Sequence, residues 1–429
     1  MSIAIRAVVP AFPGLDRISG DVLTGIEIFE KKVGKAKARM YKGKIREQEE
    51  RTGIQTRNVI DKSLQEPNTY LAAAAGHRLI EKLGLDRSKI QGFIFASSTP
   101  DYIFPPPGVS VMDALELSPR KWINTAMACS SLASTIEIAC FWMERMKLDN
   151  VLIITCDVTT RLELPNNHVE RLLFGDAGVA IYLEKGKSNE KGGFVVTDNP
   201  INKDASSLVR HKAYYPDDLP RGLLNNGLVK KHYRNDLGYI MLQAFERLEW
   251  ADELEDFTRT TGDIVDWVIP PQVSQNIIVQ GLERFQQSTG EDISGRTISD
   301  SFATHGNSGT AAAGAALSEA MKTGKIQQND SFGIPFVALG GTSAYLGYDP
   351  TMREDFHYEH IDFRKERPPT VQVLSQKLER HLQRQAADQN GNWFGLLRVL
   401  GRPLTRATKN HAPEGNGHVN RIKDQLTLL

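Results

Sequence analysis

The chain has 429 residues, of which 40% are hydrophobic and 24% charged, so it can bury a sizeable core and is neither disordered throughout nor fibrous. Its 52 basic and 52 acidic residues give a formal net charge of +0, which argues against a nucleic-acid-binding protein, because such proteins carry a basic excess or stripe. Three cysteines without a CxxC pair exclude a disulfide scaffold, and we expect a cytoplasmic protein with no signal peptide and no transmembrane segment.

Strand and helix signals alternate along the first half of the chain. Residues 3–9 are predicted to form a strand, and the Lys- and Glu-rich residues 27–51 a solvated helix. Apolar runs at 92–97, 122–125 and 151–156 are typical of buried strands. This alternation predicts an α/β fold.

A weak internal duplication relates the two halves of the chain. In the first half, a strand runs into ACSSLAS at 128–134, and FGDAGVAIY follows at 174–182. In the second half, a strand predicted at 301–304 runs into HGNSGTAAAGAA at 305–316, and GGTS follows at 340–343. The order of these signals predicts two similar α/β halves.

The predicted helix at 308–316 has almost no bulky side chain and no charge on any face. A solvent-facing helix is amphipathic, whereas a helix of small residues fits between two closely approaching layers. We therefore expect a layered architecture with helices buried between sheets. The alternative is a flexible Ala/Gly linker, which the strand signals on both sides argue against.

The composition changes after residue 350. Residues 351–429 hold 13 basic and 9 acidic residues, and 371–386 has the apolar stripe of a polar helix. We predict an N-terminal half at 1–187, a second half at 188–350 and a charged helical tail. The tail is interpreted as a packing or dimer-covering appendage, and the alternative is a docking surface for a carrier protein or a membrane.

Cys129 is the first candidate for chemistry, because it lies where a predicted strand turns into a helix. A helix N-terminus stabilises a thiolate, and small neighbouring residues leave room for a substrate at the sulfur. The alternative is a buried structural cysteine, the commonest state of a free thiol. Cys140 and Cys156 are both expected to be structural.

Asn307 lies at the corresponding strand-to-helix turn of the second half. Its amide is a candidate donor to a developing enolate or thioester oxygen, and the alternative is a helix cap, a role that asparagine also fills well. The turn at Gly340 and Gly341 is a further candidate, because glycines let backbone N–H groups approach a ligand and form half of an oxyanion hole.

Five segments in this order resemble β-ketoacyl-ACP synthase III, of the thiolase-like condensing-enzyme superfamily. They are RTGI at 51–54, AMAC at 126–129, FGDAG at 174–178, HGNSG at 305–309 and GGTS at 340–343. The resemblance implies a duplicated layered α/β/α/β/α fold and a homodimer. It also implies that an acyl group is carried from acyl-CoA or acyl carrier protein onto Cys129.

The resemblance implies roles for further residues. Cys129 and Asn307 match the catalytic thiol and amide, and the backbone of Cys129 and Gly341 matches the oxyanion hole. Arg57, Gln272 and His305 are predicted to contact substrate. No bound cofactor and no metal is expected, since the acyl-CoA or phosphopantetheine thioester is itself the substrate.

One departure from the family bears on the chemistry. The family has a catalytic histidine in a Pro-His-Gln stretch, and the matching residues here are Pro270, Pro271 and Gln272. Pro271 has neither an ionisable group nor a backbone N–H. Loss of one oxyanion donor typically costs roughly 2.7–4 kcal/mol, so decarboxylative condensation is disfavoured. His168 and Gln272 are the candidates to replace the imidazole.

Three functions are compatible with this pattern, and we favour the first. It is a thioester-dependent acyltransferase with Cys129 as nucleophile. The second is a decarboxylating ketosynthase of fatty-acid or polyketide-type biosynthesis, whose enolate another residue stabilises. The third is a non-catalytic subunit of a paired condensing enzyme, against which the intact Cys129 weighs. The sequence has no P-loop, no convincing dinucleotide fingerprint and no regular metal-ligand spacing.

Overall fold

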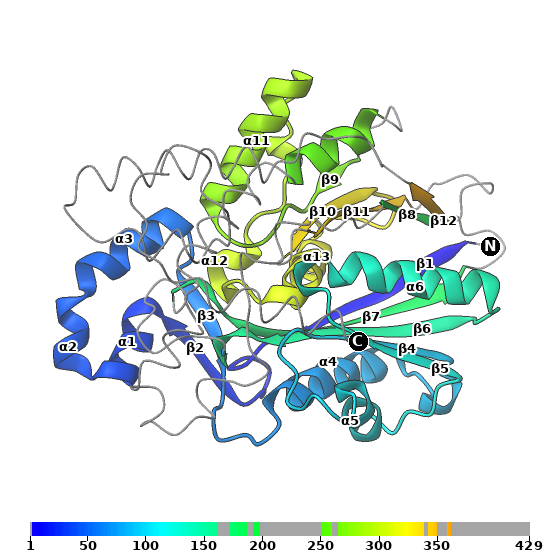
Figure 1. Cartoon of the computed structure of the whole chain (residues 1–429), viewed down its shortest axis with the longest axis horizontal. Helices are drawn as coiled ribbons and strands as arrows, with labels where there is room; N and C mark the ends of the chain where they lie inside the picture. Colours follow the sequence, from blue (N-terminus) through cyan, green and yellow to red (C-terminus); the bar gives the residue numbers. More distant parts are fainter. Residues whose placement is uncertain are drawn as a thin grey trace, which may run out of the picture. The chain divides into compact units, whose positions relative to one another are not determined.

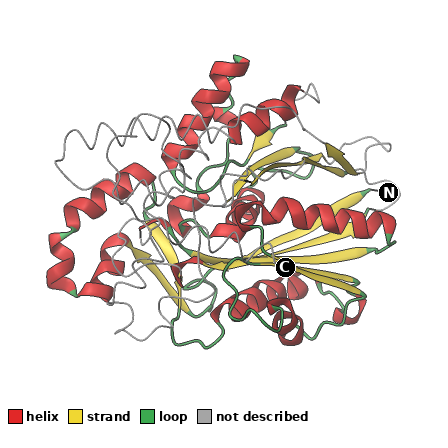
Figure 2. Ribbon diagram, viewed as in Figure 1, coloured by secondary structure: helices red, strands yellow, loops and turns green. Residues whose placement is uncertain are grey.

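In the part of the chain that the structure describes, the strands form two five-stranded sheets and a small two-stranded sheet (Figures 1 and 2). The mixed α/β class expected from the sequence is confirmed. The computed structural model describes residues 2–161, 172–186, 192–197, 250–259, 265–338, 342–349 and 358–361.

The first sheet orders its strands as β1 (Ile3–Ala11), β7 (Asp176–Lys185), β6 (Asn150–Val158), β4 (Gly92–Ala96) and β5 (Lys121–Thr125). Strands β6, β4 and β5 are mutually parallel, whereas β7 is antiparallel to both β6 and β1. Every residue of β6 is buried, as its continuous apolar sequence predicts for a strand covered on both faces.

Helices cover both faces of this sheet. The helices α4 (Pro67–Leu83) and α5 (Pro107–Ala114) pack on one face, and α6 (Ser131–Arg145) packs on the other (Figure 1). Successive side chains of β6 accordingly enter different cores: Leu152 packs in the core beneath α4, and Ile153 packs in the core shared with α6.

The second sheet orders its strands as β12 (Tyr358–Ile361), β8 (Gly193–Thr197), β11 (Thr342–Asp349), β10 (Phe332–Ala338) and β9 (Trp267–Val268). Strand β10 is antiparallel to β11 and parallel to β9. Strand β12 pairs in parallel with β8, so this sheet includes residues beyond 350. The division of the chain at residues 187 and 350 stays a prediction.

The small-residue helix lies between the two sheets, as expected. It begins as a 3-10 turn, Gly309–Ala311, and continues as α13 (Ala312–Lys322). Ala315 and Ala316 share one core with Ile181 of β7 and Phe336 of β10, together with residues of α6. A buried helix in contact with both sheets excludes the flexible linker.

Three predictions differ from the structure. The strand predicted at 122–125 forms as β5 but is not buried, because it lies at the end of the sheet. The single helix expected at 27–51 is divided into α1 (Gly25–Val33), α2 (Lys35–Met40) and α3 (Lys42–Thr52). Helix α1 ends because Gly34 adopts φ +84°, and α2 ends at Tyr41. The strand expected at 301–304 is a short helix, α12 (Ser301–His305), since a short apolar run does not distinguish helix from strand.

The two-stranded sheet pairs β2 (Gly20–Thr24) with β3 (Thr56–Ile60), and α11 (Gln275–Thr289) follows the loop after β9. Among the described helices, none is both long and apolar enough to span a bilayer. The cytoplasmic location stays a prediction, and the helix predicted at 371–386 lies outside the described residues.

Candidate active site

A small cavity brings together the residues on which the sequence analysis centres. Its walls come from four segments: Cys129, the loop 270–273 after β9, residues of the turn and helix 307–313, and residues 334–337 of β10. Its volume is about 20 Å³, which is room for roughly one water molecule. Predicted site residues Cys129, Asn307 and Gln272 therefore face one shared space, with Pro271 beside them.

Cys129 lies in the 3-10 turn Ala128–Ser130, directly before α6. The preceding residue, Ala128, has a left-handed backbone with φ +48°, a strained conformation for a residue with a side chain, and such strain clusters at functional sites. Cys129 is partly exposed, whereas Cys140 and Cys156 are buried. Burial raises the pKa of both buried thiols well above the ordinary value, so neither is a nucleophile near neutral pH.

Asn307 is held in place by its backbone. Its N–H donates to the Leu173 carbonyl over 2.9 Å, and its own carbonyl accepts from the Gly175 N–H over 3.1 Å. The side-chain Oδ1 accepts from the Gly309 N–H over 2.9 Å. Since an N–H donor fixes that atom as the oxygen, the Nδ2 amide remains to donate to a ligand. The side chain thus closes a local turn before the 3-10 turn Gly309–Ala311, and its role as a donor to substrate stays a prediction.

Pro271 lines the cavity in the stretch that matches the family's histidine, so no imidazole is supplied from this position. Its neighbour Gln272 is buried, with 3% of its surface exposed. The Nε2 of Gln272 donates to the carbonyls of Pro270 over 2.8 Å and Ile298 over 3.0 Å. Its Oε1 is buried and accepts no hydrogen bond from any described residue.

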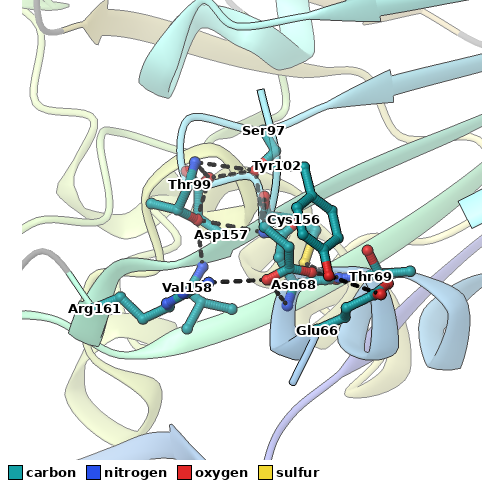
Figure 3. A network of polar contacts seen from close by, with 11 residues as sticks. Glu66, Asn68, Thr69, Ser97, Thr99, Tyr102, Cys156, Asp157, Val158 and Arg161 are labelled. Atoms are coloured by element: carbon teal, nitrogen blue, oxygen red, sulfur yellow. Dashed lines mark hydrogen bonds and ion pairs between the residues drawn. The ribbon is translucent and has the colours of Figure 1, made fainter. Parts of the chain in front are cut away.

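Asp157 supports the site through hydrogen bonds without lining the cavity, and the sequence patterns do not single it out. One carboxylate oxygen accepts from the backbone N–H groups of Ser98 over 2.7 Å and Thr99 over 3.1 Å, and the other accepts from the Thr310 N–H over 2.8 Å. Burial raises the pKa of Asp157. This side chain therefore connects the end of β6 to the turn that carries Asn307. Figure 3 shows Asp157 beside Ser97 and Thr99. The available signal is a carboxylate directly after a buried strand.

A second buried carboxylate, Asp101, organises the neighbouring region. It accepts from the N–H groups of Asn68 over 3.1 Å and Thr69 over 2.7 Å at the start of α4, and it pairs with Arg161 over 2.9 Å. Figure 3 shows Arg161, Asn68 and Thr69 in the polar network that also contains Asp157. This network stabilises the ends of the first sheet's strands.

Two glycines are required by close approach of segments around the site. A Cβ on Gly175 would lie 1.9 Å from the His305 carbonyl oxygen, so the FGDAG turn can approach the HGN turn only with glycine at this position. Gly309 has φ +58°, and a Cβ there would lie 2.6 Å from a carboxylate oxygen of Asp157. Close packing therefore explains why the FGDAG and HGNSG motifs have glycine at these two positions.

Arg57 and His305, predicted to contact substrate, lie away from the cavity. Arg57 is fully buried and donates to the Leu172 carbonyl, so its guanidinium does not meet a phosphate in solvent. The His305 ring stacks on Phe12 at 3.7 Å between centroids, with its Nδ1 2.6 Å from Asn58 Oδ1. The two substrate contacts stay predictions; in this arrangement both side chains make packing contacts.

Two further predicted residues lie outside the described residues: Gly341 of the oxyanion hole and His168, a candidate replacement for the imidazole. Among the described residues, no group of three or more His, Cys, Asp or Glu side chains is arranged to hold a metal ion.

Comparisons with known proteins agree with the geometry. A family model described as 3-oxoacyl-[acyl-carrier-protein] synthase III matches residues 123–199. The β-ketoacyl-[acyl-carrier-protein] synthase III of Trichormus variabilis is 27% identical over 298 residues, covering 69% of this chain and 85% of its own. The enzyme of the same name from Acidiphilium cryptum is 27% identical over 295 residues, covering 68% and 86%.

Solved structures share the fold at low sequence identity. The 3-oxoacyl-(acyl carrier protein) synthase III of Pseudomonas aeruginosa has a TM-score of 0.64 at 17% identity and covers 82% of this chain and 100% of its own. OleA of Xanthomonas campestris, solved with bound lauric acid and lauroyl-CoA, has a TM-score of 0.60 at 17% identity and covers 81% and 99%. These neighbours have the layered thiolase-like fold that was expected.

Proposed function

We propose that this chain, which is a β-ketoacyl-ACP synthase III-like protein with the thiolase-like fold, is an acyltransferase that forms an acyl-thioester on Cys129. The acyl donor is acyl-CoA or acyl carrier protein, and the acyl group passes to an acceptor without decarboxylation. The observation that carries the proposal is the cavity in which Cys129 and Asn307 meet while a proline occupies the histidine position.

The first half-reaction needs a thiolate and a donor to the developing oxyanion. The Cys129 thiolate attacks the thioester carbonyl, the carbon–sulfur bond of the donor breaks as the tetrahedral intermediate collapses, and CoA or phosphopantetheine leaves as a thiolate. The Nδ2 amide of Asn307 is the side-chain donor in the cavity, and its orientation is fixed because Oδ1 is held by Gly309. This step requires no imidazole.

The decarboxylating reaction requires stabilisation of a different intermediate, an enolate. Loss of carbon dioxide from a malonyl thioester leaves an enolate, whose oxygen is stabilised in this family by a histidine and an asparagine together. Pro271 provides no donor, and both N–H groups of Gln272 are already bonded to backbone carbonyls. We therefore propose acyl transfer rather than Claisen condensation.

A decarboxylating ketosynthase is the second candidate, because the curated relatives are named β-ketoacyl-[acyl-carrier-protein] synthase III. The two candidates differ in one measurement, the release of labelled carbon dioxide from malonyl-CoA or malonyl-ACP by the acyl-loaded protein. Release at a rate that supports turnover would establish the second candidate instead.

We further propose a homodimer. Strand β5 is the edge of the first sheet, and its residues Trp122 and Ile123 are 42% and 36% exposed. An exposed edge strand with large apolar side chains is suited to pairing with the same strand of a second copy. Light scattering is expected to give twice the chain mass, and a monomer would contradict the proposal.

Intact-mass spectrometry tests the acyl-enzyme. The protein is incubated with acyl-CoAs of increasing chain length, and we expect one acyl adduct that Cys129→Ala abolishes. Cys140→Ala is the matched control, since that buried thiol is expected to play no part and the adduct should persist. No adduct, or an adduct that persists in Cys129→Ala, would refute the proposal.

A further inference from the structure

A run of basic side chains extends from the end of α1 through α2 to the start of α3, the helices at the left of Figure 1. Residues 31–46 contain eight basic residues and no Asp or Glu, although the formal net charge of the whole chain is +0. All eight are exposed, and together they form what we call the basic surface: Lys31, Lys32, Lys35, Lys37, Arg39, Lys42, Lys44 and Arg46. The excess of positive charge is therefore local.

The three helices that carry the basic surface are held by a small core of their own. Ala38 of α2 and Ile45 of α3 pack there with Phe29 of α1 and with Leu172. The basic side chains lie outside this core and are exposed. Met40, in the middle of the run, is 83% exposed. A packed scaffold thus presents a cluster of cations with one large apolar side chain among them.

The charge pattern differs from that of an ordinary solvated helix, which the remainder of α3 shows. There both signs occur, and Arg46 pairs with Glu50 over 2.9 Å at i,i+4 spacing. Interleaved charges of opposite sign are typical of a solvent-exposed helix, whereas cations without such carboxylates repel one another. At the other end of the run, Lys31 pairs with Asp21 over 2.5 Å. The run between these two pairs supplies no carboxylate, so it is suited to an external polyanion.

The residue types favour a lipid surface over a protein as that polyanion. Six of the eight cations are lysines and only two are arginines, whereas protein interfaces are depleted in lysine and enriched in arginine. Lysine is a flexible point charge, and clusters of four to eight Lys and Arg residues bind anionic headgroups. An exposed apolar side chain such as Met40 can enter the boundary between the headgroups and the acyl chains.

We infer that the basic surface binds the headgroups of an anionic lipid bilayer and attaches the chain to it reversibly. The attachment is weak compared with a membrane-spanning helix, because it combines electrostatic attraction with a single apolar side chain. It is also sensitive to salt, which screens the attraction between the cations and the headgroups. The proposed acyl-enzyme chemistry does not use this surface, so the two proposals stand or fall separately.

Flotation of the full chain with vesicles tests the inference. The vesicles contain phosphatidylcholine alone or phosphatidylcholine mixed with phosphatidylglycerol. We expect binding to the mixed vesicles only, and its loss when salt is added. The double variant Lys37→Gln/Lys42→Gln should lower the partition coefficient roughly 10- to 30-fold, since each cation near an anionic surface contributes a factor of about 5.

A matched control separates the basic surface from the charge of the whole chain. Lys82→Gln/Lys322→Gln changes the net charge equally at exposed positions of α4 and α13. It should lower the partition coefficient by less than about 2-fold. All four positions are exposed, so both variants are expected to fold, which circular dichroism verifies. Equal losses in the two variants, or no loss in Lys37→Gln/Lys42→Gln, would overturn the inference.

The competing partner is an acidic protein, and the same variants identify it. Calorimetric titration with an acyl carrier protein is compared with vesicle flotation. Wild-type binding to the carrier protein that Lys37→Gln/Lys42→Gln abolishes, without binding to mixed vesicles, would assign the basic surface to a protein. Failure of the wild-type chain to bind mixed vesicles at low salt would overturn the inference by itself.

Discussion

The amide of Asn307 combines two roles that a substitution can separate. Its oxygen accepts from the Gly309 N–H, and its nitrogen is the proposed donor to the thioester oxygen. Asn307→Asp keeps an oxygen for Gly309 but replaces the donor with a carboxylate oxygen. We expect the rate of Cys129 acylation to fall by about 10²- to 10³-fold, measured by rapid quench and intact mass.

The control for this prediction is Asn307→Ala, which removes both atoms. It should acylate as slowly as Asn307→Asp and also lose about 1 kcal/mol of stability with the cap. Wild-type acylation in Asn307→Asp would show that the amide nitrogen is not the oxyanion donor.

Pro271 is the residue that distinguishes this cavity from that of a decarboxylating enzyme. Pro271→His restores an imidazole beside Cys129 and Asn307. We expect the release of carbon dioxide from malonyl-CoA by the acyl-loaded variant to rise by roughly two orders of magnitude, because one oxyanion donor contributes that much. Gln275→His, at an exposed position nearby, is the control and should show no rise. Equal rates in the wild type and Pro271→His would mean that the proline is not what limits decarboxylation.

Asp176 is a buried carboxylate whose ionisation opposes stability. It accepts from the N–H groups of Ile60 and Thr160 over 2.9 Å, and burial raises its pKa to about 6. The native protein therefore keeps a proton that the unfolded chain releases near pH 4, so this group's contribution to the free energy of unfolding falls as pH rises from about 4 to about 6.

The variant Asp176→Asn does not titrate. The difference in unfolding free energy between wild type and Asp176→Asn should therefore decrease over this pH range, by on the order of 2–3 kcal/mol. Urea denaturation at several pH values measures it. A difference that stays constant or grows with pH would contradict the shifted pKa.

At the scale of elements, α13 shows how side-chain size sets the spacing of layers. A Cβ on Gly314 would lie 3.0 Å from Cγ1 of Val179 in β7, so there is no room for a larger side chain. Gly314→Leu should reduce the free energy of unfolding by about 1–3 kcal/mol through overpacking. Met321→Leu, at a partly exposed position of the same helix, should change it by less than about 0.5 kcal/mol. Equal free energies of unfolding for the two variants would contradict the conclusion that α13 packs tightly against β7.

The sequence predicts those elements whose hydrophobic or small-residue pattern reflects their burial. The strands β4, β6 and β10 are continuous apolar runs, and α13 is distinguished by its small residues, so these were predictable. The division between α1 and α2 depends on the left-handed backbone of Gly34, and α12 is too short for its periodicity to be read. Local sequence does not determine such features, because neighbouring segments select between the alternatives.

At the scale of the whole molecule, the site depends on contacts between segments far apart in sequence. Motif order was sufficient to predict that Cys129 and Asn307 lie together, and both line the same cavity. It did not show that Arg57 and His305 pack away from this cavity, because a motif residue that packs and one that binds look the same in sequence. The role of Asp157, which joins β6 to Thr310, depends on a contact between residues 153 positions apart.

The central claim is that Cys129 accepts an acyl group. It is tested most directly by the amount of free CoA released in the first turnover with acyl-CoA, measured by chromatography without an added acceptor. We predict a rapid release of one CoA per chain, followed by a slow phase, and no rapid release from Cys129→Ala. Absence of the rapid phase in the wild-type protein, or its persistence in Cys129→Ala, would contradict the account.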